Sequence, residues 1–190
     1  MPATRSFDLD RTLAAFGIAR FDVEQGLRVP VHTLAGALHA DFRMPSVDYN
    51  AFLRATRALT RDEREVRKAY ERAAFNVLFN NRDDHARNFS FRLGRDRQWR
   101  LAPGYDLTFC EGPGGEHRMD VCGEAREITR AHMLALARQA GVDPAWSMGV
   151  LDRMGELAVG FKGHAAGRGI RAATITRVAA AIAANRKRLA

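Results

Sequence analysis

The sequence predicts a mainly α protein of the α+β class, with one short hairpin set among the helices. Three observations support this class. Apolar residues recur at helical spacing from Val66 to Leu78, so that they share one face of a helix. Helix-start signals follow at Thr129 and at Asp143, which precedes a proline. Two short β-rich runs, 89–93 and 98–101, flank a turn, which is the pattern of a hairpin.

The first sixty residues carry weaker local signals. They suggest a strand at 18–22 and a turn at 24–26, which is rich in turn-forming residues. Residues 31–39 are expected to form a short helix. Ser46 is expected to cap a second helix that reaches about Leu59.

The helix that follows has the strongest local support. Thr60 and Glu63 have the spacing of a capping box, in which each side chain bonds to the other residue's backbone. The apolar stripe of this helix needs a core to cover it, so the helix should be central. It ends at an Asn-rich loop, which places the next residues on a rigid support.

Loops and three helices are expected to complete the chain. Residues 111–115 form a flexible loop, and 117–121 form a small strand. One helix is capped by Thr129 and ends at Gly141, and another starts at Asp143 and Pro144. The last helix runs from about Ala172 to the terminus, after a glycine-rich hinge at 163–169.

Composition limits the classes of protein. The 190 residues fit one domain with a substantial core. There is no apolar run of about 18 residues and no apolar signal core, so we expect a cytoplasmic protein without a membrane partner. The two cysteines match neither a metal spacing nor a disulfide framework. The net charge of +8 can attract nucleic acid, nucleotide phosphates or an acidic protein, but no aromatic-interleaved basic motif appears, so DNA contact is expected only indirectly.

The segment 80–109 carries the clearest chemical signal. Asp83 is followed five residues later by Asn88, and Asp106 comes after the hairpin. Protein kinases combine a loop Asp that accepts a hydroxyl proton with an Asn and a later Asp that hold Mg²⁺ under the nucleotide phosphates. Because Mg²⁺ keeps several waters, one carboxylate and one amide are enough beside the phosphates. The spacing therefore predicts phosphoryl transfer with ATP as co-substrate.

Other interpretations compete with this one. Asp83 and Asp84 could belong only to a polar turn that ends a helix, and Asp84 competes as the base, although only Asp83 stands five residues before Asn88. Together with His85 and Asp106, the two carboxylates could also form the metal site of a phosphohydrolase. One histidine in the loop is few for such a two-metal centre.

Neighbouring residues have open roles. His85 could donate a hydrogen bond to phosphate or stabilise the loop by bonding to its backbone, and Arg87 could face phosphate or solvent. Tyr105 is expected to pack beneath the metal-binding segment. The other histidines have no ligand spacing. Neither glycine-rich segment, 112–115 or 163–169, has the G-x-G-x-x-G pattern of a nucleotide loop.

The segments NNRDDHARNFSF and WRLAPGYDL resemble the signature of the HipA-like toxin kinases, whose loop reads N-x-D-x-H-x-K-N-F-S and whose metal segment reads L-x-P-x-Y-D. The resemblance is specific across 66–141 and looser across 16–60, where Arg20-Phe21-Asp22 is similar to the family's hinge strand E-R-F-D-R. It implies the helical C-terminal lobe of a protein-kinase-like fold. Residues 16–60 would carry the hinge and first helices, 61–125 the catalytic loop and metal segment, and 126–190 a helical bundle.

The resemblance also implies a serine/threonine protein kinase of a toxin–antitoxin system. Its partners would be a protein substrate, such as an aminoacyl-tRNA synthetase, and a DNA-binding antitoxin. Asp83 would be the catalytic base, and Asn88 and Asp106 would hold Mg²⁺. The implied nucleotide-binding residues are Arg20 and Phe21 (through their backbone, at the adenine), His85, Asn88, Tyr105 and Asp106.

The sequence departs from the family pattern in three ways. Ala19 replaces the hinge glutamate, and Arg87 replaces the loop lysine. The third departure is the family's N-terminal lobe, with its glycine-rich loop and phosphate-gripping lysine, which these 190 residues do not contain. The chain is therefore expected to be the C-terminal lobe alone and inactive as a fragment. The alternative is a non-catalytic kinase-like module that binds an antitoxin or DNA.

Overall fold

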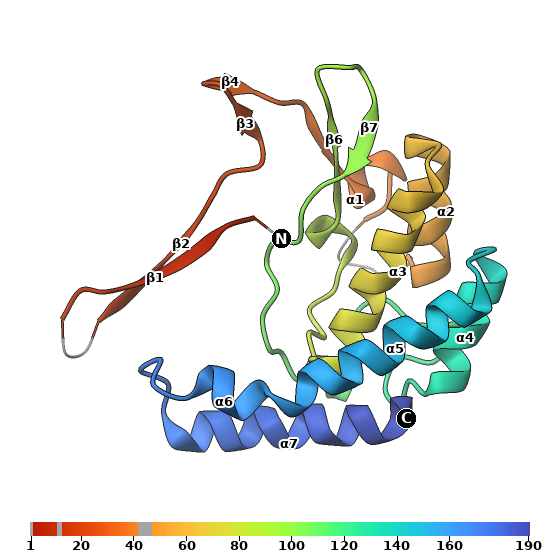
Figure 1. Ribbon diagram of the computed structural model, residues 1–190. Helices are drawn as coiled ribbons and strands as arrows, with labels where there is room; N and C mark the ends of the chain where they lie inside the picture. Colours follow the sequence, from red (N-terminus) through yellow and green to blue (C-terminus); the bar gives the residue numbers. More distant parts are fainter. Residues whose placement is uncertain (1, 11–12, 42–46) are drawn as a thin grey trace.

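The computed structural model describes residues 2–10, 13–41 and 47–190. Most of the described chain folds into a helical body, and three small antiparallel sheets lie beside it (Figure 1). This architecture confirms the mainly α, α+β class. The helices are α1 (Leu34–Ala37), α2 (Tyr49–Thr60), α3 (Glu63–Leu78), α4 (Arg130–Gln139), α5 (Pro144–Val159), α6 (Phe161–Ala165) and α7 (Ala172–Leu189).

Helix α3 lies at the centre of the body, in contact with α2, α5 and α7. The prediction of its cap is wrong. Asp62 caps α3 by accepting a 2.9 Å hydrogen bond from the backbone N–H of Arg64. Thr60 is the last residue of α2. Its hydroxyl donates to the carbonyl of Thr56 at 2.7 Å and accepts from the N–H of Asp62 at 3.3 Å, ahead of the first turn of α3. The apolar stripe is confirmed, since the buried residues include Val66, Ala69, Tyr70, Ala73, Ala74, Val77 and Leu78.

A three-stranded sheet joins the body to the N-terminal part of the chain. The predicted hairpin is confirmed as β6 (Ser90–Leu93) and β7 (Trp99–Leu101). A third strand, β5 (Val31–Thr33), pairs with β6, although the sequence predicted that a helix starts at residue 31. The side chain of Thr33 accepts a hydrogen bond from the N–H of Gly36 at 3.1 Å, so α1 begins only after Thr33.

Two strands near the start of the chain form an arm that the sequence did not predict. Strands β1 (Thr4–Asp8) and β2 (Ala14–Ile18) pair antiparallel and extend away from the helical body (Figure 1). The predicted strand at 18–22 is therefore wrong, because the β1–β2 ladder ends at Ile18. The predicted turn at 24–26 is confirmed. It joins β3 (Val23–Glu24) to β4 (Leu27–Arg28) through Gln25 and Gly26, both with positive φ.

The C-terminal helices follow their predicted start signals. Thr129 and His132 form a capping box at α4, and Asp143 caps α5 ahead of a proline. Asp48 caps α2, while the predicted cap Ser46 lies outside the described residues. The predicted strand at 117–121 is reduced to one bridge between Val121 and Glu124.

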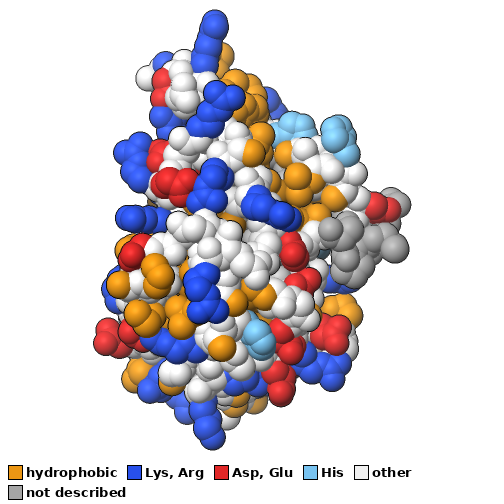
Figure 2. Space-filling model, turned by 90° about the vertical axis from the view of Figure 1, so that its right-hand side faces the viewer, with side chains coloured by type: hydrophobic (Ala, Val, Ile, Leu, Met, Phe, Trp, Pro, Cys, Tyr) orange, Lys and Arg blue, Asp and Glu red, His pale blue; other side chains and the backbone are white. Residues whose placement is uncertain are grey.

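Among the described residues, the face in Figure 2 shows no concentrated basic patch. Lys and Arg side chains are spread over that face and alternate with Asp and Glu (Figure 2). Within residues 2–10, 13–41 and 47–190, no helix combines the length and the apolar character that crossing a bilayer requires.

Helix α7 fixes the end of α3 through one buried amide. Asn185 donates from Nδ2 to the carbonyls of Val77 (3.0 Å) and Leu78 (3.3 Å) and to Oδ1 of Asn80 (3.1 Å). The last carbonyls of a helix have no partner within the helix, so this side chain supplies bonds that α3 lacks. It thereby fixes the point where the Asn-rich loop begins.

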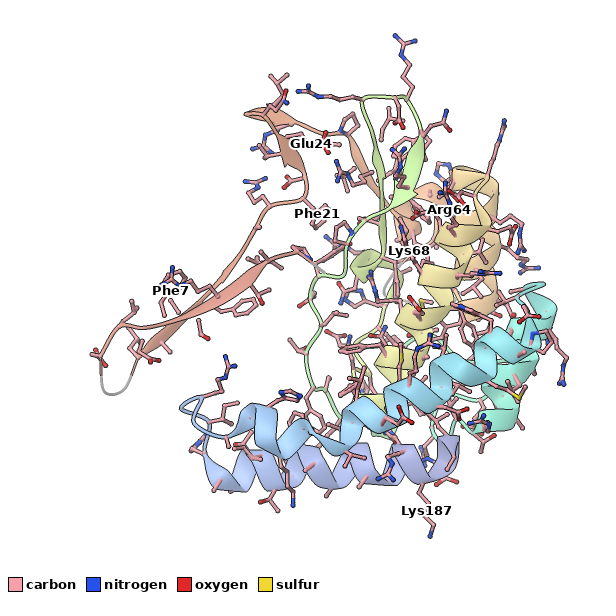
Figure 3. The ribbon with its side chains drawn as sticks, in the orientation of Figure 1. Phe7, Phe21, Glu24, Arg64, Lys68 and Lys187 are labelled. Carbon is pink, nitrogen blue, oxygen red and sulfur yellow. The ribbon has the colours of Figure 1, made fainter. Side chains whose placement is uncertain are left out.

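We expect Asn185→Ala to lower the free energy of unfolding by about 1–3 kcal/mol, because it leaves buried carbonyls unpaired. Alanine is the better helix former, so propensity acts in the opposite direction and a net loss identifies the missing hydrogen bonds. Urea unfolding measures the change. Lys187→Ala is the matched control, since Lys187 lies on α7 and points away from the body (Figure 3). Equal stabilities of the two variants would contradict this role of Asn185.

Candidate active site

The loop after α3 is held at both ends by regular structure. It leaves α3 through Asn80, which has a φ of 57°, and the N–H of Asn81 returns to the carbonyl of Asn76 at 2.9 Å. It then forms a 3₁₀ turn over Ala86–Asn88 and enters β6. Residues 83–88 are thus positioned between the central helix and the central strand of the sheet.

Asp83 and Asn88 lie at the two ends of this loop and are linked through the backbone. The Asn88 side chain donates from Nδ2 to the carbonyl of Asp83 at 3.0 Å. That bond orients the amide, so Oδ1 remains as the acceptor for another group. The Asp83 carboxylate is 48% exposed, and Nε2 of His85 lies 3.9 Å from its Oδ1. Asp83 therefore presents its carboxylate to solvent.

Asp84 faces the opposite way. Its side chain has no exposed surface and accepts hydrogen bonds from the Tyr49 hydroxyl (2.6 Å) and the Arg118 N–H (2.8 Å). Its Oδ2 also lies 2.7 Å from Nδ1 of His117, which is itself buried. The carboxylate is thus occupied within the protein. The phosphohydrolase interpretation, which required Asp84 beside Asp83 at a metal, does not fit this geometry.

A buried chain of hydrogen bonds continues from Asp84 into the body. Asn81 donates to Oδ1 of Asn76 at 3.1 Å, and Asn76 donates to the Tyr49 hydroxyl at 3.0 Å. Burial, reinforced by the neighbouring Asp84 carboxylate, raises the pKa of Tyr49 well above its ordinary value. The hydroxyl therefore stays protonated and donates to Asp84. This chain links the start of α2, the middle of α3 and the loop.

The second carboxylate arrives on the segment after β7. Asp106 is exposed and has a φ of 52°, a backbone conformation uncommon for a residue with a side chain. Just before it, the Tyr105 hydroxyl donates to the carbonyl of Arg87 at 2.6 Å and lies 2.5 Å from Oγ of Ser90. Tyr105 therefore ties the Asp106 segment to the residue next to Asn88. Burial raises the pKa of Tyr105, which keeps this donor protonated.

The hinge-like segment reaches the same place. The Phe21 ring stacks on the Tyr105 ring, with 5.5 Å between centroids and 29° between planes. Arg20 instead pairs its exposed guanidinium with Asp22 at 2.5 Å. The predicted site residues therefore form a connected group, in which Phe21 meets the metal segment and the Arg20 side chain is directed to its neighbour.

The donor set fits a hard cation. Asn88 Oδ1 and the Asp106 carboxylate are oxygen donors on two segments that Tyr105 joins, and Mg²⁺ commonly takes one or two protein carboxylates or amides and completes its shell with water and phosphate. Among the described residues there is no group of three or more His, Cys, Asp or Glu side chains that could hold a metal. The arrangement therefore suits Mg²⁺ shared with a nucleotide rather than a cage made by the protein alone.

Sequence reasoning missed the residues that support this group. Tyr49 and His117 lie far from the loop in sequence, and no spacing rule connects them with it. Arg82 was also missed. Its guanidinium donates to the carbonyl of Gly115 and, at 3.3 Å, to that of Arg126. These bonds hold the 111–115 loop against the loop that follows α3. At Gly112, a Cβ would lie 2.1 Å from the Glu116 carbonyl oxygen, so only glycine fits there.

These features define the helical C-terminal lobe of a protein-kinase-like fold. The sequence model described as the HipA-like C-terminal domain matches residues 1–160, and the chain belongs to this family. A solved complex of HipA, HipB and operator DNA from the Shewanella oneidensis MR-1 toxin–antitoxin system is similar in fold, with a TM-score of 0.77 and 17% sequence identity. The match covers 99% of this chain and 51% of that one, so the chain spans about half its length. No curated protein sequence gave a significant match.

The tyrosines of the folded protein are expected to ionise late. Burial raises the pKa of all three, and that of Tyr70 rises to about 12. Unfolded tyrosines ionise near pH 10, so above about pH 10 the unfolded state binds fewer protons and stability should fall with rising pH. Ultraviolet titration of tyrosinate and urea unfolding from pH 8 to 11 measure both effects. Normal titration of all three tyrosines in the folded protein would contradict the buried network.

Proposed function

We propose that this chain is the catalytic C-terminal lobe of a HipA-like serine/threonine protein kinase, the toxin of a toxin–antitoxin system. In this proposal it transfers the γ-phosphoryl group of ATP to a serine or threonine of a protein. The observation that carries the proposal is the divided orientation of the loop. Asn88 bonds to the Asp83 carbonyl, the Tyr105 hydroxyl ties the segment that carries Asp106 to the Arg87 carbonyl, and Asp84 is turned into the core.

Each residue has a role that its position supports. Asp83 accepts the hydrogen bond, and then the proton, of the attacking hydroxyl. Asn88 Oδ1 and the Asp106 carboxylate hold Mg²⁺, which supplies charge stabilisation to the phosphates when bound. His85, next to Asp83, donates to a phosphate oxygen. Because little covalent chemistry falls to the protein, catalysis depends on holding these groups in place.

The adenine is proposed to lie against the hinge-like segment. Phe21 and Tyr105 stack, which fixes the backbone of Arg20 and Phe21 beside the metal segment. Within the described residues, the backbone groups of Arg20 and Phe21 take part in neither a strand ladder nor a backbone hydrogen bond outside one. They are therefore suited to pair with the polar edge of a base.

A second lobe is proposed to complete the phosphate site, whether it is joined to this chain or separate from it. The β1–β2 arm supports this, because an isolated two-stranded hairpin is marginally stable in water. Phe16 is 70% exposed, and Phe7 and Ile18 on the same arm are also exposed. The arm would give the proposed second lobe a strand pair and apolar side chains to pack against.

The partners follow from the family and stand as part of the proposal. The similar Shewanella structure is titled as a complex with HipB and operator DNA, so we propose a DNA-binding antitoxin as a partner of this chain. The alternative, a non-catalytic module, is less well supported. A non-catalytic module would not need Asp83, Asn88 and Asp106 together with the hydrogen bonds that support them.

In the protein that carries both lobes, we expect Asp83→Ala to lower kcat by at least about 10²–10⁴-fold, the contribution typical of a general base. Mg-ATP affinity and thermal stability should stay unchanged, because the side chain is half exposed. Asn88→Ala and Asp106→Ala should instead lose metal-dependent ATP binding. Asp96→Ala, which removes an exposed carboxylate in the β6–β7 turn, is the control. Full turnover by the Asp83→Ala protein would refute the assignment.

The isolated chain is expected to show no measurable kinase activity and at best about millimolar affinity for Mg-ATP, because each charge-assisted phosphate contact it lacks is worth roughly 1.5–3 kcal/mol. Titration calorimetry, with and without Mg²⁺, measures the affinity. Micromolar binding by the isolated chain would show that its own residues grip the phosphates, and the second-lobe proposal would fail.

A further inference from the structure

A cavity of about 420 Å³ lies between α3 and the segment that follows β7. Helix α3 contributes Lys68, Arg72 and Phe75 to its wall, and the opposite wall is formed by 101–104 and Leu107. Figure 3 shows Lys68 on the side of α3 that faces this strand. The volume is in the range of small-ligand sites. The cavity lies outside the group formed by Asp83, Asn88 and Asp106.

Arg72 is the unusual group in this cavity. Its one hydrogen bond to the described residues is long, 3.4 Å from Nη2 to the carbonyl of Ala102. The guanidinium packs directly on Gly104, where a Cβ would lie 3.1 Å from Cζ. No carboxylate of the described residues pairs with it, and partial burial, which disfavours the charged form, lowers the pKa of Arg72. A guanidinium has five donors in a fixed plane, so most of this one's capacity is unused.

The charges around Arg72 do not compensate it. Lys68, one turn earlier on the same face, is neutralised by Glu65, whose Oε1 lies 2.6 Å from Nζ. Glu65 in turn accepts the N–H of Leu101 with its other oxygen at 2.9 Å. Glu71 lies 3.9 Å from Arg153 instead. The positive charge of Arg72 is thus left without a carboxylate partner among the described residues, and an added anion would compensate it.

We propose that this cavity binds a carboxylate carried on a short apolar stem. The planar guanidinium matches a carboxylate in bidentate geometry, and Phe75, Pro103 and Leu107 surround it with apolar surface. One uncompensated cation, with Glu71 also in the wall, suits a single negative charge better than a phosphate dianion. The ligand rests against Gly104, two residues before Asp106, so its binding restrains the metal segment. The proposal does not depend on the kinase function.

The test uses the full chain labelled with ¹⁵N and titrated with sodium hexanoate at constant ionic strength. The Gly104 amide and the Arg72 Nε–H signals should shift and saturate together. Hexanamide, which lacks the charge, and inorganic phosphate, which lacks the stem, should bind at least about tenfold more weakly, as expected for loss of a charged hydrogen-bonding pair. Comparing hexanoate with these two ligands separates specific binding of a carboxylate from a general effect of anions.

Two variants on α3 complete the experiment. Arg72→Met should weaken hexanoate binding by at least about tenfold and leave the protein equally or more stable, because it removes a partly buried charge that no carboxylate of the described residues pairs with. Arg72→Lys keeps the charge without the fork and should give intermediate affinity, which also covers the case in which Arg72→Met does not fold. Arg64→Met, at an exposed arginine of the same helix, is the control. Unchanged binding in both Arg72 variants, tighter binding of phosphate than of hexanoate, or no saturable shift would overturn the proposal.

Discussion

The position of the 83–88 loop depends on the carboxylate of Asp84, which has no exposed surface. Removing the Asp84 side chain from water carries a penalty of several kcal/mol unless hydrogen bonds replace its hydration. Here they come from two distant parts of the chain. One is the hydroxyl of Tyr49 at the start of α2, and the other is the ring of His117 together with the backbone N–H of Arg118. The loop can satisfy this carboxylate only in one arrangement. Asp83, the next residue back along the chain, is then directed outward, so the core that buries one aspartate presents the other.

Local signals predicted the helices, because capping and periodicity act over a few residues. The apolar stripe of α3, the Thr129 cap and the Asp143-Pro144 start are all of this kind. The errors at residues 31–33 and at the β1–β2 arm fall where a distant partner decides the outcome, whereas the error at the α3 cap lies between two near neighbours, Thr60 and Asp62. Residues 31–33 form β5 because they pair with β6, which is distant in sequence. The β1–β2 arm likewise depends on strand pairing, which the composition of its residues did not predict.

The candidate site shows the same division. The offset from Asp83 to Asn88 identified the exposed aspartate, since the spacing lies within one loop. It could not show that Asp84 bonds to Tyr49 and His117, because those residues meet the loop only in the folded chain. Tyr105 was expected to pack beneath the metal segment. It also donates to the Arg87 carbonyl, a contact that depends on the register of β6 and β7.

The unusual backbone conformation of Asp106 depends on contacts made within the chain. A side-chain-bearing residue at positive φ costs about 1–3 kcal/mol and persists only where its flanks are fixed. Both flanks are fixed within the chain. Tyr105 is tied to the Arg87 carbonyl, and the Cys110 N–H donates to the Asn80 carbonyl at 2.9 Å. Asn80 is in turn held by Asn185 of α7. The backbone that carries Asp106 is therefore held in place by residues of this chain, from the loop after α3 and from α7.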